Sequence, residues 1–181
     1  MIVNLKAVPD NQGGGPLPLG KYACRMHVIP NQVDTQGSPM LDGDNNPAPW
    51  RTTAGDPMWK LEMLILDGPY KGRKILDQIS FGAAALKRVK IIYVRAGLAK
   101  GDEEKIDLQP DDLEGTMWYV TIDRLEESKK INPKTNKPYM NGKTAFDGYE
   151  VMDAETAARL SKVAAEASAA ATAETADDLP F

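Results

Sequence analysis

The chain is poor in the side chains from which most metal and redox sites are built. Its 181 residues include a single cysteine, Cys24, and a single histidine, His27. One cysteine excludes an internal disulfide framework and is typical of a reducing compartment. One histidine and one cysteine cannot form a zinc cluster, and no Gly-x-Ser-x-Gly motif surrounds any serine. We therefore expect neither a cofactor nor an enzymatic activity.

Long apolar runs are also missing. No stretch approaches the roughly 18 residues that a membrane-spanning helix needs, and the first residues lack the charged-then-apolar order of a signal peptide. Hydrophobic residues make up 42% of the chain and charged residues 27%, which is ordinary for a globular domain with its own core. We expect a cytoplasmic protein with no membrane partner.

The chain has no excess of positive charge either, but its net charge is unevenly distributed between two segments. The net charge is −4, which at first sight disfavours a polyanionic partner. Residues 153–181 contain six acids and two bases, a sum of −4 that accounts for the whole excess. Residues 1–152 are therefore neutral, with twenty acids and twenty bases. Such segregation is typical of a folded body followed by an interaction tail.

Hydrophobic alternation in the body predicts a mainly β fold. The alternation and the turn signals predict five strands, with a helix between the third and fourth. The strands are expected at 21–28, 58–66, 73–81, 116–125 and 146–152, and the helix at 82–96. Two long polar connections, 30–57 and 126–144, join the first strand to the second and the fourth to the fifth. The second of them is expected to be a long hairpin, with chain reversals at 132–136 and 141–142. This order is typical of an OB-like five-stranded barrel, in which those connections flank the ligand-binding face. A small α+β sandwich is also compatible with it.

The pattern divides the chain into an N-terminal arm at 1–20, a domain at 21–152 and a flexible tail at 153–181. The start of the tail, near 154–165, is compatible with a partly helical segment. The helix is expected to bury one stripe of side chains: Leu86, Val89, Tyr93 and Ala96. Gly97 is expected to cap its end. Trp59 and Trp118 share faces with aliphatic residues and are predicted core, whereas Tyr119 points away from it.

The last five residues form the most specific motif: Asp177, Asp178, Leu179, Pro180 and Phe181. Two carboxylates, two apolar side chains around a rigid proline and a free terminal carboxylate suit an apolar pocket beside a cation. This tip, which follows an Ala/Glu-rich spacer, resembles that of bacterial and phage single-stranded-DNA-binding proteins. The resemblance implies that the tip recruits replication or recombination proteins.

The body carries a second resemblance, in four motifs: Gly20-Lys21-Tyr22, Trp59-Lys60-Leu61-Glu62-Met63, Tyr70-Lys71-Gly72-Arg73-Lys74-Ile75 and Leu113-Glu114-Gly115. Across residues 20–152 they are similar to a family of phage-encoded OB-fold single-strand binders. The long loop at 30–57 and the acidic loop at 102–104 depart from the family's pattern. The resemblance implies coating of single-stranded DNA during phage DNA replication, recombination or repair in the host cytoplasm. OB-fold binders occur as monomers and as homo-oligomers, and the sequence leaves both open.

Binding a single strand without sequence preference needs cations for the phosphates and aromatic faces for the bases. The candidate cations are Lys60, Lys71, Arg73, Lys74, Arg124, Lys129, Lys130, Lys134, Lys137 and Lys143. The candidate stacking residues are Tyr70, Tyr119 and Tyr139, with Trp50 in the long loop. The basic residues of the helix, Lys87, Arg88 and Lys90, are interpreted mainly as solvent-facing.

Two other functions are compatible with the same sequence. The first is a protein-interaction adaptor of the replication machinery that uses the tip and binds no nucleic acid. The second is an OB-fold binder of RNA or of duplex DNA. The charge segregation also suggests the hypothesis that the acidic tip occupies a basic groove of the body when DNA is absent.

Overall fold

A computed structural model describes residues 15–102, 105–133 and 136–162. The chain divides into two compact units, with the boundary between Val151 and Met152. Of the residues singled out in the sequence, Lys134 and the tip at 177–181 lie outside the described residues.

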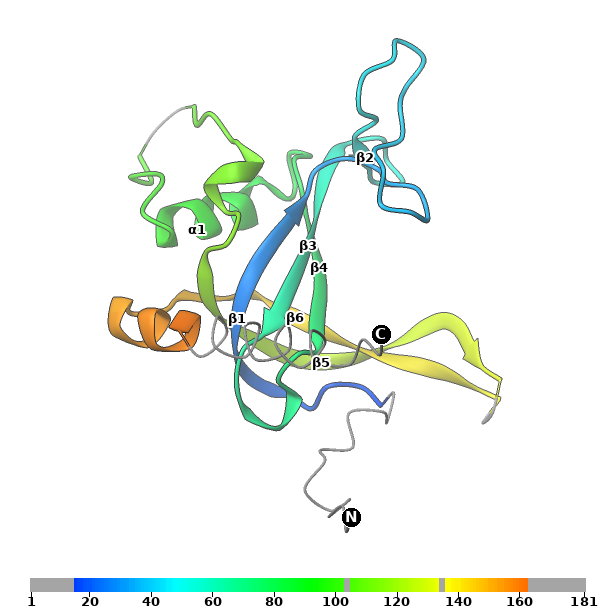
Figure 1. The fold of residues 1–181 in the computed structure, drawn as a ribbon. Helices are drawn as coiled ribbons and strands as arrows, with labels where there is room; N and C mark the ends of the chain where they lie inside the picture. The colour runs from blue at the N-terminus through cyan, green and yellow to red at the C-terminus, as the bar shows by residue number, and fades with distance from the viewer. Residues whose placement is uncertain (1–14, 103–104, 134–135, 163–181) are drawn as a thin grey trace, which may run out of the picture. The chain divides into compact units, whose positions relative to one another are not determined.

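The first unit is built on one antiparallel sheet of six strands (Figure 1). The strands are β1 (Gly20–Ile29), β2 (Trp50–Arg51), β3 (Pro57–Ile65), β4 (Lys74–Ser80), β5 (Met117–Asn132) and β6 (Lys137–Val151). Their order is β4-β3-β1-β5-β6, and the short β2 also pairs with β3. The helix α1 (Leu86–Arg95) lies between β4 and β5 in the chain, and two 3-10 turns, η2 (Gly68–Tyr70) and η3 (Pro110–Asp112), lie in the connections. The expected mainly β fold is thus confirmed. None of the described helices combines the length and apolar character needed to span a bilayer.

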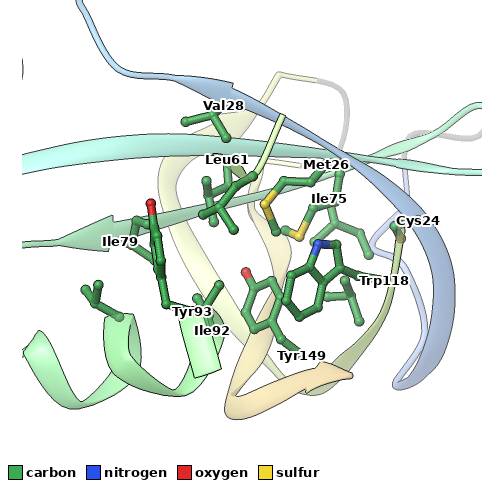
Figure 2. Close-up of a cluster of buried hydrophobic side chains, with 14 of the residues drawn as sticks. Cys24, Met26, Val28, Leu61, Ile75, Ile79, Ile92, Tyr93, Trp118 and Tyr149 are labelled. Atoms are coloured by element: carbon green, nitrogen blue, oxygen red, sulfur yellow. The ribbon is translucent and has the colours of Figure 1, made fainter. Parts of the chain in front are cut away.

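The core lies on the face toward which alternate residues of β1 and β3 point. Met26 of β1 pairs with Met63 of β3, and both side chains are buried. Trp118 of β5 and Tyr149 of β6 pack edge to face with ring centroids 6.0 Å apart, in the cluster that Figure 2 shows. Edge-to-face packing adds about 0.5–1.5 kcal/mol to the stabilisation from burial. Trp118 is therefore a core residue, as predicted.

Helix α1 covers this core with Val89, Ile92 and Tyr93. The prediction that Leu86 belongs to the buried stripe is wrong, because the helix begins at Leu86 and leaves that side chain 47% exposed. The predicted end is correct: Gly97 follows the C-cap Ala96 with a φ of +72°, a conformation that glycine adopts without steric cost.

The long hairpin predicted at 126–144 is present, and the chain reverses between Asn132 and Lys137 as expected. The second predicted reversal, at 141–142, is wrong because those residues belong to β6, and both strands are longer than predicted. Strands β5 and β6 pair out to Asn132 and Lys137 and form a long hairpin, which Figure 1 shows in yellow-green to yellow beyond the ends of the other strands. The two strands satisfy each other's backbone hydrogen bonds in its outer half. Both faces there are solvated, so the sequence needs no apolar alternation. The alternation of apolar residues in the sequence stops where the strands leave the core, although the strands themselves continue.

The loop at 30–57 has a fixed internal structure. Three residues spaced eight apart form a ring of backbone hydrogen bonds: Gln32 donates to Ala48, Ala48 to Met40, and Met40 to Gln32, with N···O distances of 2.7–2.8 Å. Asp34 and Asp42 occupy equivalent places in two successive turns, and each carboxylate accepts two backbone N–H groups. The loop is therefore a repeated turn motif rather than a structureless connection.

Candidate nucleic-acid interface

Two adjoining grooves lie beside β4, and residues of the β5–β6 hairpin line both of them. The loop-side groove, of about 800 Å³, is bounded by Val33 and Trp50 of the 30–57 loop and by Arg124 of the hairpin. The hairpin-side groove, of about 540 Å³, is bounded by Arg73 on one side and by Lys130 and Tyr139 of the hairpin on the other. Leu76 and Lys143 line both grooves, so the two adjoin at these residues.

Strand alternation explains why polar side chains face these grooves. Leu61 and Met63 of β3 point into the core, so Lys60 and Glu62 point outward. On β4 the buried Ile75 is followed by Leu76, which is 67% exposed at the junction of the two grooves. The loop and the hairpin then add side chains to these grooves, Val33 and Trp50 from the loop and Lys130 and Tyr139 from the hairpin.

Charges in the loop-side groove are largely paired. Its lining includes four cations, Lys60, Arg88, Arg124 and Lys143, and three carboxylates, Glu62, Asp77 and Glu126. Glu126 lies 3.0 Å from Arg124 Nε and 3.5 Å from Lys143 Nζ. Lys60 Nζ lies 3.0 Å from the centroid of the Trp50 ring, and burial lowers the pKa of this ammonium. Lys60 and Trp50 therefore contact each other.

The hairpin-side groove has four cations, Arg73, Lys74, Lys130 and Lys143, and no carboxylate among the described residues that line it. Lys74 reaches Glu62 at 2.5 Å, and the Arg73 guanidinium donates to the Gly15 carbonyl at 2.7 Å. Exposed side chains of Leu76, Tyr139 and Met140 lie among these cations. The groove thus combines positive charge with apolar and aromatic surface.

A buried polar cluster joins the two end strands of the sheet. Among the described residues β4 pairs only with β3, and β6 only with β5. Side chains bridge the gap: Asp77 of β4 accepts hydrogen bonds from Thr144 Oγ1 and, at 2.5 Å, from the Tyr149 hydroxyl of β6. The same carboxylate is ion-paired with Arg88 of α1, which also donates to Thr144 Oγ1 at 2.9 Å. This cluster fixes the hairpin relative to the groove floor.

The cluster raises the pKa of two of its members, Tyr149 and Arg88. Burial, followed by the charge of Asp77, raises the pKa of Tyr149 well above its ordinary value. Burial by itself lowers the pKa of Arg88, but the charge and hydrogen bond of Asp77 outweigh it, so the net pKa is raised. The Arg88 side chain is mostly withdrawn from water and ion-paired with Asp77, which corrects its interpretation as mainly solvent-facing.

The structure brings together part of the set that the sequence predicted. The grooves collect Trp50, Lys60, Arg73, Lys74, Arg124, Lys130, Tyr139 and Lys143. Five predicted residues lie outside both grooves: Tyr70, Lys71, Tyr119, Lys129 and Lys137. Tyr70 packs against Tyr22 with ring centroids 6.1 Å apart, and Lys21 Nζ lies 5.1 Å from the centroid of the Tyr119 ring.

Sequence reasoning missed Asp77, Leu76 and Met140. Asp77 occupies an inward position between Ile75 and Ile79, and a carboxylate at an apolar position of an otherwise regular strand was the available signal. Leu76 and Met140 gave no signal, because their exposure depends on the hairpin that crosses beside them.

Within the described part of the chain, no three His, Cys, Asp or Glu side chains converge as metal ligands would. Comparison of the sequence with protein-family models and with curated proteins finds no match.

Proposed function

We propose that this protein binds single-stranded DNA without sequence preference along the two grooves. The observation that carries the proposal is local charge: seven cations against three carboxylates line the grooves, although residues 1–152 are neutral. Cations that neutralise phosphates release condensed counterions, which supplies most of the non-specific affinity for nucleic acid. Tyr139 and Leu76 supply surface on which bases pack.

We also propose that the sheet is a variant of the OB barrel. Strand β1 pairs with both β3 and β5, and the Asp77 cluster links the end strands β4 and β6. The two elements beside the grooves are the ones that flank the ligand in OB folds, namely the connections after the first strand and between the last two. Closure by side chains in place of a backbone ladder leaves the hairpin free to extend beyond the barrel.

The biological setting follows from the resemblance of the tip and body. In this proposal the protein coats single strands during phage DNA replication and recombination, and the residues at 177–181 recruit partner enzymes. The neutral body and the acidic tail then have separate roles, because the body holds the nucleic acid and the tail holds proteins.

Fluorescence anisotropy with labelled oligothymidylate, duplex DNA and RNA at two salt concentrations tests the proposal. We expect the tightest binding to oligothymidylate, with a log–log salt slope near −0.7 per phosphate neutralised. Lys130→Gln combined with Lys143→Gln should weaken binding, whereas Lys87→Gln combined with Lys90→Gln on the exposed face of α1 should not. A preference for duplex or RNA would contradict the proposal, and no binding to any of the three would leave the adaptor function.

A further inference from the structure

We infer that the two grooves are unequal subsites for one strand, with the hairpin-side groove as the primary phosphate-binding subsite. The inference rests on the proposed function and specifies which part of the interface engages a short strand. It follows from how the charges in each groove are already paired, from the apolar surface beside them and from the two residues, Leu76 and Lys143, that line both grooves.

The hairpin-side groove offers cations that need not give up an ion pair. Among the described residues Lys130 and Arg73 have no carboxylate partner, and Arg73 is held toward the groove by the Gly15 carbonyl. A phosphate that approaches these two cations meets no carboxylate among the described residues that line the groove. Counterion release is therefore gained there without breaking an existing ion pair.

The loop-side groove neutralises most of its own charge. Glu126 holds Arg124 and Lys143, and Asp77 holds Arg88 in the buried cluster. A phosphate that approaches Arg124 must compete with Glu126, so part of the electrostatic gain is cancelled. Lys60 is free of ion pairs among the described residues, but it lies against one face of the Trp50 ring, and a base can reach that face only after Lys60 moves.

Apolar surface reinforces the difference between the subsites. Tyr139 and Met140 of the hairpin and Leu76 of β4 are exposed beside the unpaired cations. Because Leu76 and Lys143 belong to both grooves, a strand seated in the hairpin-side groove extends past them into the loop-side groove. The seven residues of β4 span roughly 20 Å, so a short oligonucleotide covers one groove and a longer one covers both.

The test compares Lys130→Gln with Lys60→Gln, two single lysine substitutions of the full chain, one in each groove. Each is titrated against oligothymidylates of about 4 and about 12 nucleotides, within the range of OB-fold site sizes. At about 0.1 M salt, loss of one phosphate contact should weaken binding about fivefold and reduce the salt slope by about 0.7. We expect Lys130→Gln to weaken both oligonucleotides and Lys60→Gln to weaken only the longer one.

The outcomes separate this inference from the function on which it rests. If Lys60→Gln weakens the short oligonucleotide as much as Lys130→Gln does, or if Lys130→Gln leaves both unchanged, the order of the subsites is wrong while the function stands. If the unmodified protein binds neither oligonucleotide, the proposed function itself fails. Matching thermal unfolding of the two variants shows that the comparison is made between folded proteins.

Discussion

Substitution of Asp77 by alanine removes the carboxylate that joins the two end strands of the sheet. The side chains of Asp77 and Arg88 are 13% and 17% exposed, so their ion pair is mostly withdrawn from water. The same carboxylate accepts hydrogen bonds from Thr144 and Tyr149. Its removal leaves a buried guanidinium and a buried phenol without their acceptor, and the hairpin loses its link to β4.

The size of the effect follows from the burial of the pair. Removing one partner of a buried ion pair costs about 3–5 kcal/mol, which for a domain of this size lowers Tm by roughly 10 °C or more. Glu62→Ala provides the control, because it removes the partner of Lys74 in a pair whose lysine is more than half exposed. Such surface pairs contribute about 0–1 kcal/mol. Urea and thermal unfolding followed by circular dichroism measure both variants.

A second variant tests the physical cause. Asp77→Leu combined with Arg88→Met removes both charges, so no unpaired ion remains in the core, and most of the lost stability should return. The reasoning is refuted if Asp77→Ala costs no more than Glu62→Ala, or if the double variant is less stable than the single one. Either result would mean that the cluster does not depend on a buried charge pair.

Three further predictions concern other parts of the chain. Burial raises the pKa of the Cys24 thiol to about 12, so iodoacetamide should label it only after unfolding in urea, and rapid labelling of the native protein would contradict its position in the core. Partial burial raises the pKa of Glu114, but hydrogen bonds from the Val28 amide and the His27 ring outweigh it, so the net pKa is lowered. The contribution of Glu114 to folding stability is therefore present above its ordinary pKa of 4.5 and is lost as pH falls through its lower pKa in the folded protein. Glu114→Gln should reduce the acid dependence of urea unfolding. An unchanged dependence would show that another group causes it. Deletion of 177–181 should preserve or tighten binding to oligothymidylate, because it removes two acidic side chains that repel the phosphates. A large loss of affinity would contradict the separate roles of body and tail.

The strands around the core were predictable because their side chains alternate between water and the core. Cys24 and Met26 of β1, and Leu61 and Met63 of β3, carry a period-two pattern that only a half-buried strand requires. The reversal of the hairpin at 132–136 was predictable from its turn residues, but the length of its strands beyond Leu125 was not, because neither face of the outer hairpin packs on the core. The ring in the 30–57 loop had a signal that was overlooked, an Asp at 34 and 42 and a Pro at 39 and 47, each eight residues apart.

The candidate interface was predictable in its charges but not in its geometry. The sequence predicted Lys60, Lys74 and Lys130 as candidate cations, and all three line the grooves. It did not separate Tyr139 from Tyr119, because the difference depends on where the hairpin turns relative to β4. The Asp77 cluster joins residues up to 72 positions apart in the sequence, and no local pattern records such a contact.

The most direct test of the central claim is lysine acetylation, read by mass spectrometry, with and without saturating oligothymidylate. Binding along the grooves predicts protection of Lys74, Lys130 and Lys143, while Lys87 and Lys90 on the exposed face of α1 keep their reactivity. Protection of the helix lysines with unchanged reactivity at the three groove lysines would place the strand elsewhere and contradict the account.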